Sequence, residues 1–121
     1  LLRILPAVTV VRLGFALSAA GAAAFQLAPG HPALCLFVAG AMGLVQGASF
    51  AAVPELNAPP GDRALANGGL AQMGNLGNTL GVPVLAATGA AFGHPGLVVP
   101  LAAALCCGAL VHGVLARARA A

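Results

Sequence analysis

The chain has 121 residues, of which 60% are hydrophobic and only 6% are charged, and its formal net charge is +3. This composition, with a mean hydropathy of +1.01, excludes an ordinary soluble domain, in which about 25% of the residues are charged. It indicates an integral membrane protein. The few charges lie at the margins of long apolar stretches: Arg3, Arg12, Arg63, Arg117 and Arg119, with the acids Glu55 and Asp62.

Four apolar stretches follow one another, each of roughly the length that crosses the ~30 Å hydrocarbon core. They show no period-two alternation, and only helices satisfy every backbone group in lipid without closing a barrel. We therefore expect an all-α integral membrane fold of four antiparallel transmembrane helices. Their expected bounds are about 7–28, 33–53, 64–92 and 97–116.

Local signals refine these bounds. Pro54 and Glu55 are expected to end the second helix, and Asp62 is placed to cap the first turn of the third. Pro100 is tolerated in the opening turn of the fourth helix. The three cysteines fall inside the spans, where a thiol usually behaves as a small buried hydrophobe.

The arginines also give an orientation. In an antiparallel arrangement, all of them fall on one side, and the connections around His31 and His94 carry no Lys or Arg. Because Lys- and Arg-rich short loops stay inside, we expect a multi-pass protein of the inner (plasma) membrane with both termini cytoplasmic. The net positive charge then follows from topology and attraction to anionic lipid. No nucleic acid partner is expected, since Trp and Tyr are absent.

The third helix has an unusual polar face. At about 100° per residue, five polar side chains fall within an arc of roughly 140°, flanked by glycines and by an apolar face. Unpaired amides in hydrocarbon are expensive, so this face must look toward protein or water. The second helix shows a weaker version of the pattern, beside the small-residue pair Gly43 and Gly47. The polar residues of the third helix are Asn67, Gln72, Asn75, Asn78 and Thr79, the glycines are Gly74, Gly77 and Gly81, and the apolar residues are Met73, Leu76 and Leu80.

Two interpretations of the polar face remain open. Any single amide can serve as a hydrogen-bonding link between helices, worth about 0.6 kcal/mol. The whole cluster exceeds what the first and fourth helices could pair, so it needs partners outside this chain or a water-filled cavity. Pro83 cannot donate to the carbonyl of Thr79, so the third helix should bend there, next to Gly81, as a static kink or as a moving hinge.

Four segments of the chain resemble the closing part of a major facilitator superfamily transporter: Gly43 to Phe50, Val53 to Leu56, Asp62 to Gly68, and Ala71 to Pro83. That family has twelve helices in two six-helix halves, with both termini cytoplasmic. The resemblance implies that the four helices correspond to the ninth to twelfth. The tenth and eleventh would line the cavity or contact the other half, and the ninth and twelfth would support them from the lipid side.

We therefore expect the C-terminal fragment of a secondary transporter that moves small molecules by alternating access. Its partners would be a small-molecule substrate, the lipid bilayer and the missing N-terminal helices of the same transporter; neither enzyme activity nor a cofactor is expected. The alternatives are a non-transporting membrane scaffold subunit, or a small four-helix multidrug exporter, although no carboxylate lies in the first helix. The candidate substrate-binding or cavity-lining residues are Gln46, Ser49, Gln72, Asn75, Asn78 and Thr79, with Gly81 and Pro83 as the hinge.

Overall fold

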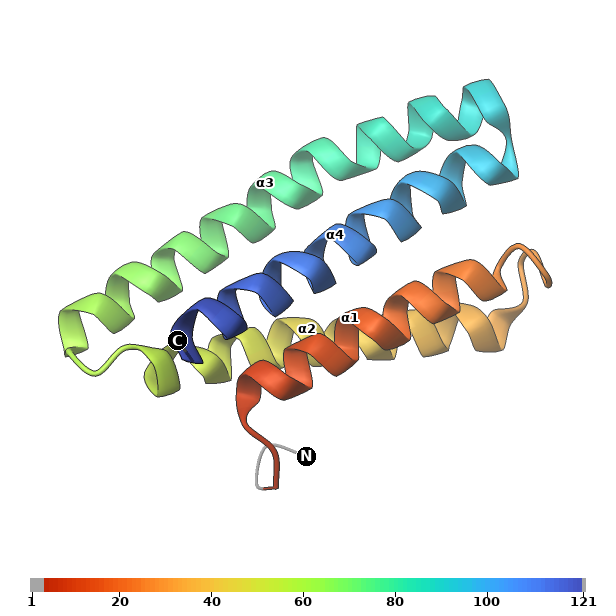
Figure 1. Cartoon of the computed structure of the whole chain (residues 1–121). Helices are drawn as coiled ribbons and strands as arrows, with labels where there is room; N and C mark the ends of the chain where they lie inside the picture. Colours follow the sequence, from red (N-terminus) through yellow and green to blue (C-terminus); the bar gives the residue numbers. More distant parts are fainter. Residues whose placement is uncertain (1–3, 121) are drawn as a thin grey trace.

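The structure, a computed structural model, describes residues 4–120 as an all-α arrangement of four antiparallel helices (Figure 1). The N-terminal end of α1, the α2–α3 connection and the C-terminal end of α4 lie at one end of the molecule. The α1–α2 and α3–α4 connections lie at the other (Figure 1). Arg3 lies outside the described residues. The helices are α1 (Ala7–Ala24), α2 (Pro32–Leu56), α3 (Pro60–Phe92) and α4 (His94–Ala120).

The helix ends differ from those expected. α1 stops at Ala24 and turns follow it, whereas the other three helices extend beyond their expected bounds. Because Pro60 has a fixed φ and no N–H to lose, it begins α3. Asp62 consequently lies within the first turn and makes no capping hydrogen bond, so the predicted cap is wrong. Pro54 and Pro100 lie inside α2 and α4 instead of at their ends.

Within the described part of the chain, three helices are long and apolar enough to cross a membrane, namely α1, α2 and the His94–Arg119 part of α4. They indicate a multi-pass membrane protein. The expectation of four spans is thus supported for three of them. α3 has 33 residues, which corresponds to about 50 Å, so its length suffices. Its amides, glycines and opening charges make it more polar than the others.

α1 packs closely against α2 through a row of small residues. A Cβ added at Gly14 would lie 2.8 Å from Val45 Cγ2, and one at Gly21 would lie 2.6 Å from Val38 Cγ2. Ser18 lies between these glycines in sequence and is fully buried. Helices that share a lipid environment associate through such van der Waals contact, since burial from lipid adds no hydrophobic term. The small residues of this interface are therefore on α1, whereas a Cβ added at Gly43 or Gly47 of α2 would meet nothing within 4 Å.

Both ends of α1 are bonded to other helices. At its start, the Ala7 N–H donates to the Glu55 carboxylate, 3.0 Å from Oε2 and 3.3 Å from Oε1. At its end, His94 Nε2 lies 2.9 Å from the Phe25 carbonyl oxygen and can donate to it. These are helix-terminal groups that lack partners within the helix. His31 and His94 are therefore not equivalent, because His31 is exposed at the start of α2.

α3 is joined to the rest mainly at its C-terminal end. Gly93 has a φ of 64°, which an L side chain adopts only with strain, and it allows α4 to begin at once. Next to this turn, a Cβ at Gly89 would lie 2.6 Å from Leu97 Cδ2, and one at Gly96 would overlap the Thr88 carbonyl. No residue of α3 is buried, and residues 71–80 are all exposed. The middle of α3 thus has no cover within the described chain.

The α1–α2 contact predicts that alanine substitutions at two glycines change the free energy of unfolding by different amounts. Gly14→Ala should lower the free energy of unfolding by about 1–3 kcal/mol, because the new methyl overpacks against Val45. Gly40→Ala is the matched control, since a Cβ there meets nothing within 4 Å. Unfolding in SDS of the chain in mixed micelles, followed by helical circular dichroism, measures both. Equal midpoints for the two variants would contradict the packing.

The bond from Glu55 to α1 predicts a second stability difference. Glu55→Ala should lower the free energy of unfolding by about 1–2 kcal/mol, because the first N–H of α1 loses a charged acceptor. Glu55→Gln keeps one oxygen and should lose less. Asp62 lies in the first turn of α3 but makes no capping hydrogen bond, so Asp62→Ala should lower the free energy of unfolding by about 0.5 kcal/mol or less. The same SDS titration compares them, and an Asp62→Ala loss as large as that of Glu55→Ala would refute the assignment.

Candidate functional site

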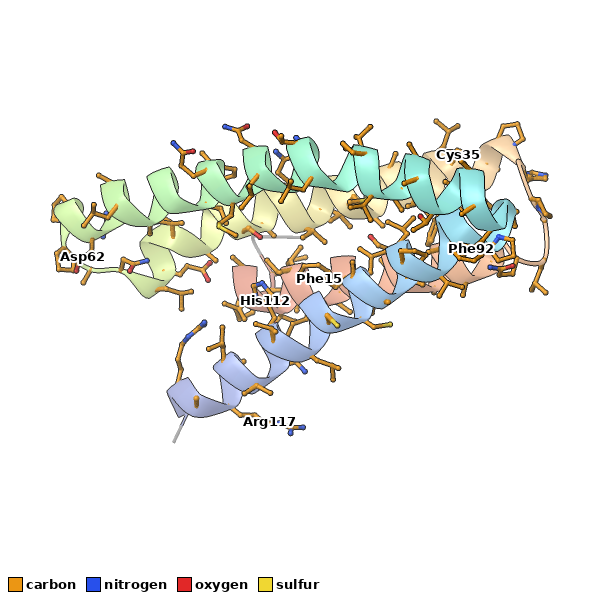
Figure 2. All side chains as sticks on the ribbon, turned by 90° about the horizontal axis from the view of Figure 1, so that it is seen from above. Phe15, Cys35, Asp62, Phe92, His112 and Arg117 are labelled. Carbon is orange, nitrogen blue, oxygen red and sulfur yellow. The ribbon has the colours of Figure 1, made fainter. Side chains whose placement is uncertain are left out.

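An open cavity of about 700 Å³ lies between α2 and α3, with further walls from α1 and α4. It forms because α3 and α4 meet at their turn and diverge toward the other end (Figure 2). Two polar residues of α2, Gln46 and Ser49, line it together with Asn75 and Asn78 of α3. Its apolar lining includes Phe15, Met42, Phe50, Met73 and Leu105.

The structure brings together four of the six predicted cavity residues and leaves two apart. Gln72 and Thr79 are exposed and do not line this cavity. The Thr79 hydroxyl donates to the Asn75 carbonyl oxygen at 2.9 Å, and Ser49 Oγ donates to the Val45 carbonyl oxygen at 2.7 Å. Such bonds to the preceding helical turn use the hydroxyl proton locally. Both hydroxyls can therefore offer only acceptor lone pairs to a ligand.

The three cavity amides differ from these hydroxyls because their groups are free. Gln46, Asn75 and Asn78 are exposed, and the side-chain hydrogen bonds found among residues 4–120 involve other groups. Each amide offers two donor hydrogens and a carbonyl acceptor. The site can therefore hold polar groups by hydrogen bonding.

His112 of α4 also lines the cavity, and it is not among the candidate residues predicted from the sequence. Its ring lies beside that of Phe15, with centroids 5.4 Å apart and an angle of 39° between the planes (Figure 2). It lines the large cavity and a second one of about 220 Å³. The signal was present in the spacing: His112 comes seven residues after Leu105, so both lie on one helix face. Leu105 is buried and lines the same cavity.

A separate apolar groove of about 370 Å³ runs along the outside of α3. The residues expected to share an apolar face lie here, joined by two of the glycines. A Cβ added at Gly74, Gly77 or Gly81 would meet nothing within 4 Å. The close backbone approach that these glycines permit is thus unused within the described chain. The groove is lined by Met73, Leu76, Gly77, Leu80, Gly81 and Val84.

The cysteines are not part of the site. Cys35, Cys106 and Cys107 are free and exposed, so the expectation that they are buried is wrong for this chain. Among the residues that the structure describes, no group of three or more His, Cys, Asp or Glu could hold a metal ion. α3 runs through Pro83 without interruption, and the hinge at Gly81 and Pro83 stays a prediction.

Comparison of the chain with protein-family models, with curated proteins and with solved structures finds no match. The resemblance to the major facilitator superfamily therefore depends on the residues and motifs of the sequence itself.

The cavity predicts a pattern of water access. In a background without the native cysteines, Asn75→Cys and Asn78→Cys should react with a hydrophilic methanethiosulfonate, because the reactive thiolate forms only where water reaches it. Leu110→Cys should not react. Leu110 is 68% exposed on the apolar surface of α4, a candidate membrane span, so a thiol there would face lipid and not water. Labelling rates in proteoliposomes measure this. Protection of Asn75→Cys equal to that of Leu110→Cys would mean that the amides are buried against protein or lipid.

Proposed function

We propose that this chain is the closing four-helix segment of a secondary transporter that moves small molecules by alternating access. One observation carries the proposal: the uncovered middle of α3 presents free amides to a cavity that α2 shares. A helix in lipid cannot leave amides unpaired, so water, substrate or further helices must meet them. A transport path supplies all three in turn.

The proposal requires α3 to cross the membrane as the fourth span. α2 and α4 are both apolar enough to cross, and α3 connects the end of α2 to the beginning of α4 at the opposite end of the molecule (Figure 1). If its neighbours cross, α3 must return through the same layer. Polar helices are tolerated at that depth where they line a water-filled cavity. The arginine-bearing end would be cytoplasmic.

Within this proposal the polar residues have different roles. Gln46, Asn75 and Asn78 would contact substrate, because their amides are free and line the cavity. Gln72 and Thr79 lie outside the cavity and would meet the other half of the transporter. The unused glycine surfaces of α2 and α3 support this, because small residues let further helices approach closely. Gly81 and Pro83 would let α3 bend as the two halves rock.

A non-transporting scaffold subunit would use the same glycine surfaces, but it has no need of a water-filled amide cavity. Mutations separate the two roles. If the amides only link helices, replacing them should lower stability and activity in step. If they line a path, activity should fall at normal stability.

The transport proposal predicts opposite outcomes for neighbouring residues of α3. In the complete transporter, Asn75→Leu should abolish most transport while expression and thermal stability stay normal, because at most about 1–2 kcal/mol of interhelical bonding is lost. Leu76→Ala, in the outer groove, should retain transport. Proteoliposome uptake of a labelled aliphatic acid, an aliphatic amine and a hexose provides the measurement. Transport lost equally in both variants, or retained in Asn75→Leu, would count against the proposal.

A further inference from the structure

Among residues 4–120, Arg119 is the one charged residue that lines either of two adjacent cavities. The smaller cavity is lined by Arg119 and His112, and the larger one also includes His112. Neither acid of the chain lines either cavity: the Glu55 carboxylate accepts hydrogen bonds from the Ala7 N–H, and Asp62 lies in the exposed first turn of α3. From residues 4–120, a ligand would therefore meet one cationic group, one imidazole and no carboxylate.

The two cavities adjoin each other. Ser49, Leu70 and His112 line both, so these residues mark their junction. The smaller cavity, of about 220 Å³, also includes Asn57 and Arg119 near the arginine-bearing end. The larger cavity, of about 700 Å³, is mostly apolar, with two methionines and two phenylalanines among its lining residues. Its volume is within the range of about 300–1,000 Å³ for small-molecule pockets.

We propose that the joined cavities bind an amphipathic organic anion, with its acidic head between His112 and Arg119 and its apolar body in the larger cavity. A guanidinium pairs with a carboxylate or phosphate through two parallel hydrogen bonds. An imidazole offers at least one N–H donor in either protonation state. Methionines adapt to apolar bodies of irregular shape. An organic cation would be repelled at the same position, with no carboxylate to offset the repulsion.

The anion can come from two sources, a soluble amphipathic acid or an anionic lipid of the surrounding leaflet. Both present an acidic group on an apolar chain, and both fit the shape of the joined cavities. The inference rests on the proposed function only where it identifies the class of molecule transported. Binding itself does not require transport, so the two can be tested separately.

The chain contains no Trp and no Tyr, so one introduced tryptophan reports on one place. Met42→Trp places it in the larger cavity, and Leu110→Trp places the control on the exposed surface of α4. Each variant is titrated in phosphatidylcholine nanodiscs, at mildly alkaline pH, with three quenchers that share one chain: ω-bromododecanoate, ω-bromododecanol and ω-bromododecyltrimethylammonium. Quenching of Leu110→Trp measures partition into the lipid and corrects for it.

After this correction, the carboxylate should quench Met42→Trp at about tenfold lower concentration than the ammonium, which corresponds to one strong charged contact. Adding Arg119→Gln or His112→Leu should remove that preference. Arg117→Gln is the matched control, because Arg117 is exposed and lines neither cavity. Equal quenching by all three compounds, or an equal effect of Arg117→Gln and Arg119→Gln, would overturn the inference.

Nanodiscs containing phosphatidylglycerol then identify the occupant. If quenching by the carboxylate disappears, the anionic lipid holds the site; if it persists, the soluble acid does, and the anion site stands in both cases. Preferential binding of the acid without any transport would overturn the transport proposal and leave the site intact. Transport of a labelled compound without that preference would overturn the site and leave the transport proposal intact.

Discussion

If α3 crosses the membrane, the free amide side chains in its middle need hydrogen-bonding partners, and the other helices must leave room for those partners. An amide left unpaired in hydrocarbon costs several kcal/mol, and residues 71–80 have no cover within the described chain. Three cavity residues, Gln46, Asn75 and Asn78, face a common space between α2 and α3. Solvation by water or by a polar ligand resolves this cost without further protein. Gln72 lies outside that space, so in a membrane-spanning α3 its amide would need cover from other helices. The Thr79 hydroxyl already donates to the Asn75 carbonyl oxygen.

The packing divides the chain into a tightly held part and a loosely held one. α1 is fixed along its length by Gly14 and Gly21 against α2, and at its ends by Glu55 and His94. α3 depends on the turn at its C-terminal end. A closely packed α1–α2 pair beside a weakly attached α3 suits a protein in which one helix bundle moves against another. The moving surface must not be bonded permanently to its neighbours.

The sequence predicted the four helices and their antiparallel order, because apolar length and helical periodicity depend only on local spacing. Four of the six candidate residues line one cavity, and their role there stays a prediction. The sequence did not predict which small residues make the contact between α1 and α2: the spacing of Gly43 and Gly47 matches a known packing pattern, yet Gly14, Ser18 and Gly21 make the contact. Which of two small-residue faces meets a neighbour depends on the orientation of each helix about its axis, and the spacing of residues in the sequence does not determine this orientation. His112 and the Glu55 bond to α1 were missed for the same reason, since both join residues far apart in the chain. Asp62 fails as a cap because Pro60 begins the helix two residues earlier.

The proposed function depends on α3 crossing the membrane, and labelling at its two ends tests this most directly. Gly61→Cys and Phe92→Cys bracket the helix, in a background in which Cys35, Cys106 and Cys107 are replaced. An impermeant maleimide is added to sealed vesicles from one side and then, in a second sample, from the other. If α3 spans the membrane, Gly61→Cys should react only from the cytoplasmic side and Phe92→Cys only from the opposite side. Reaction of both positions from the same side would show that α3 does not span the membrane.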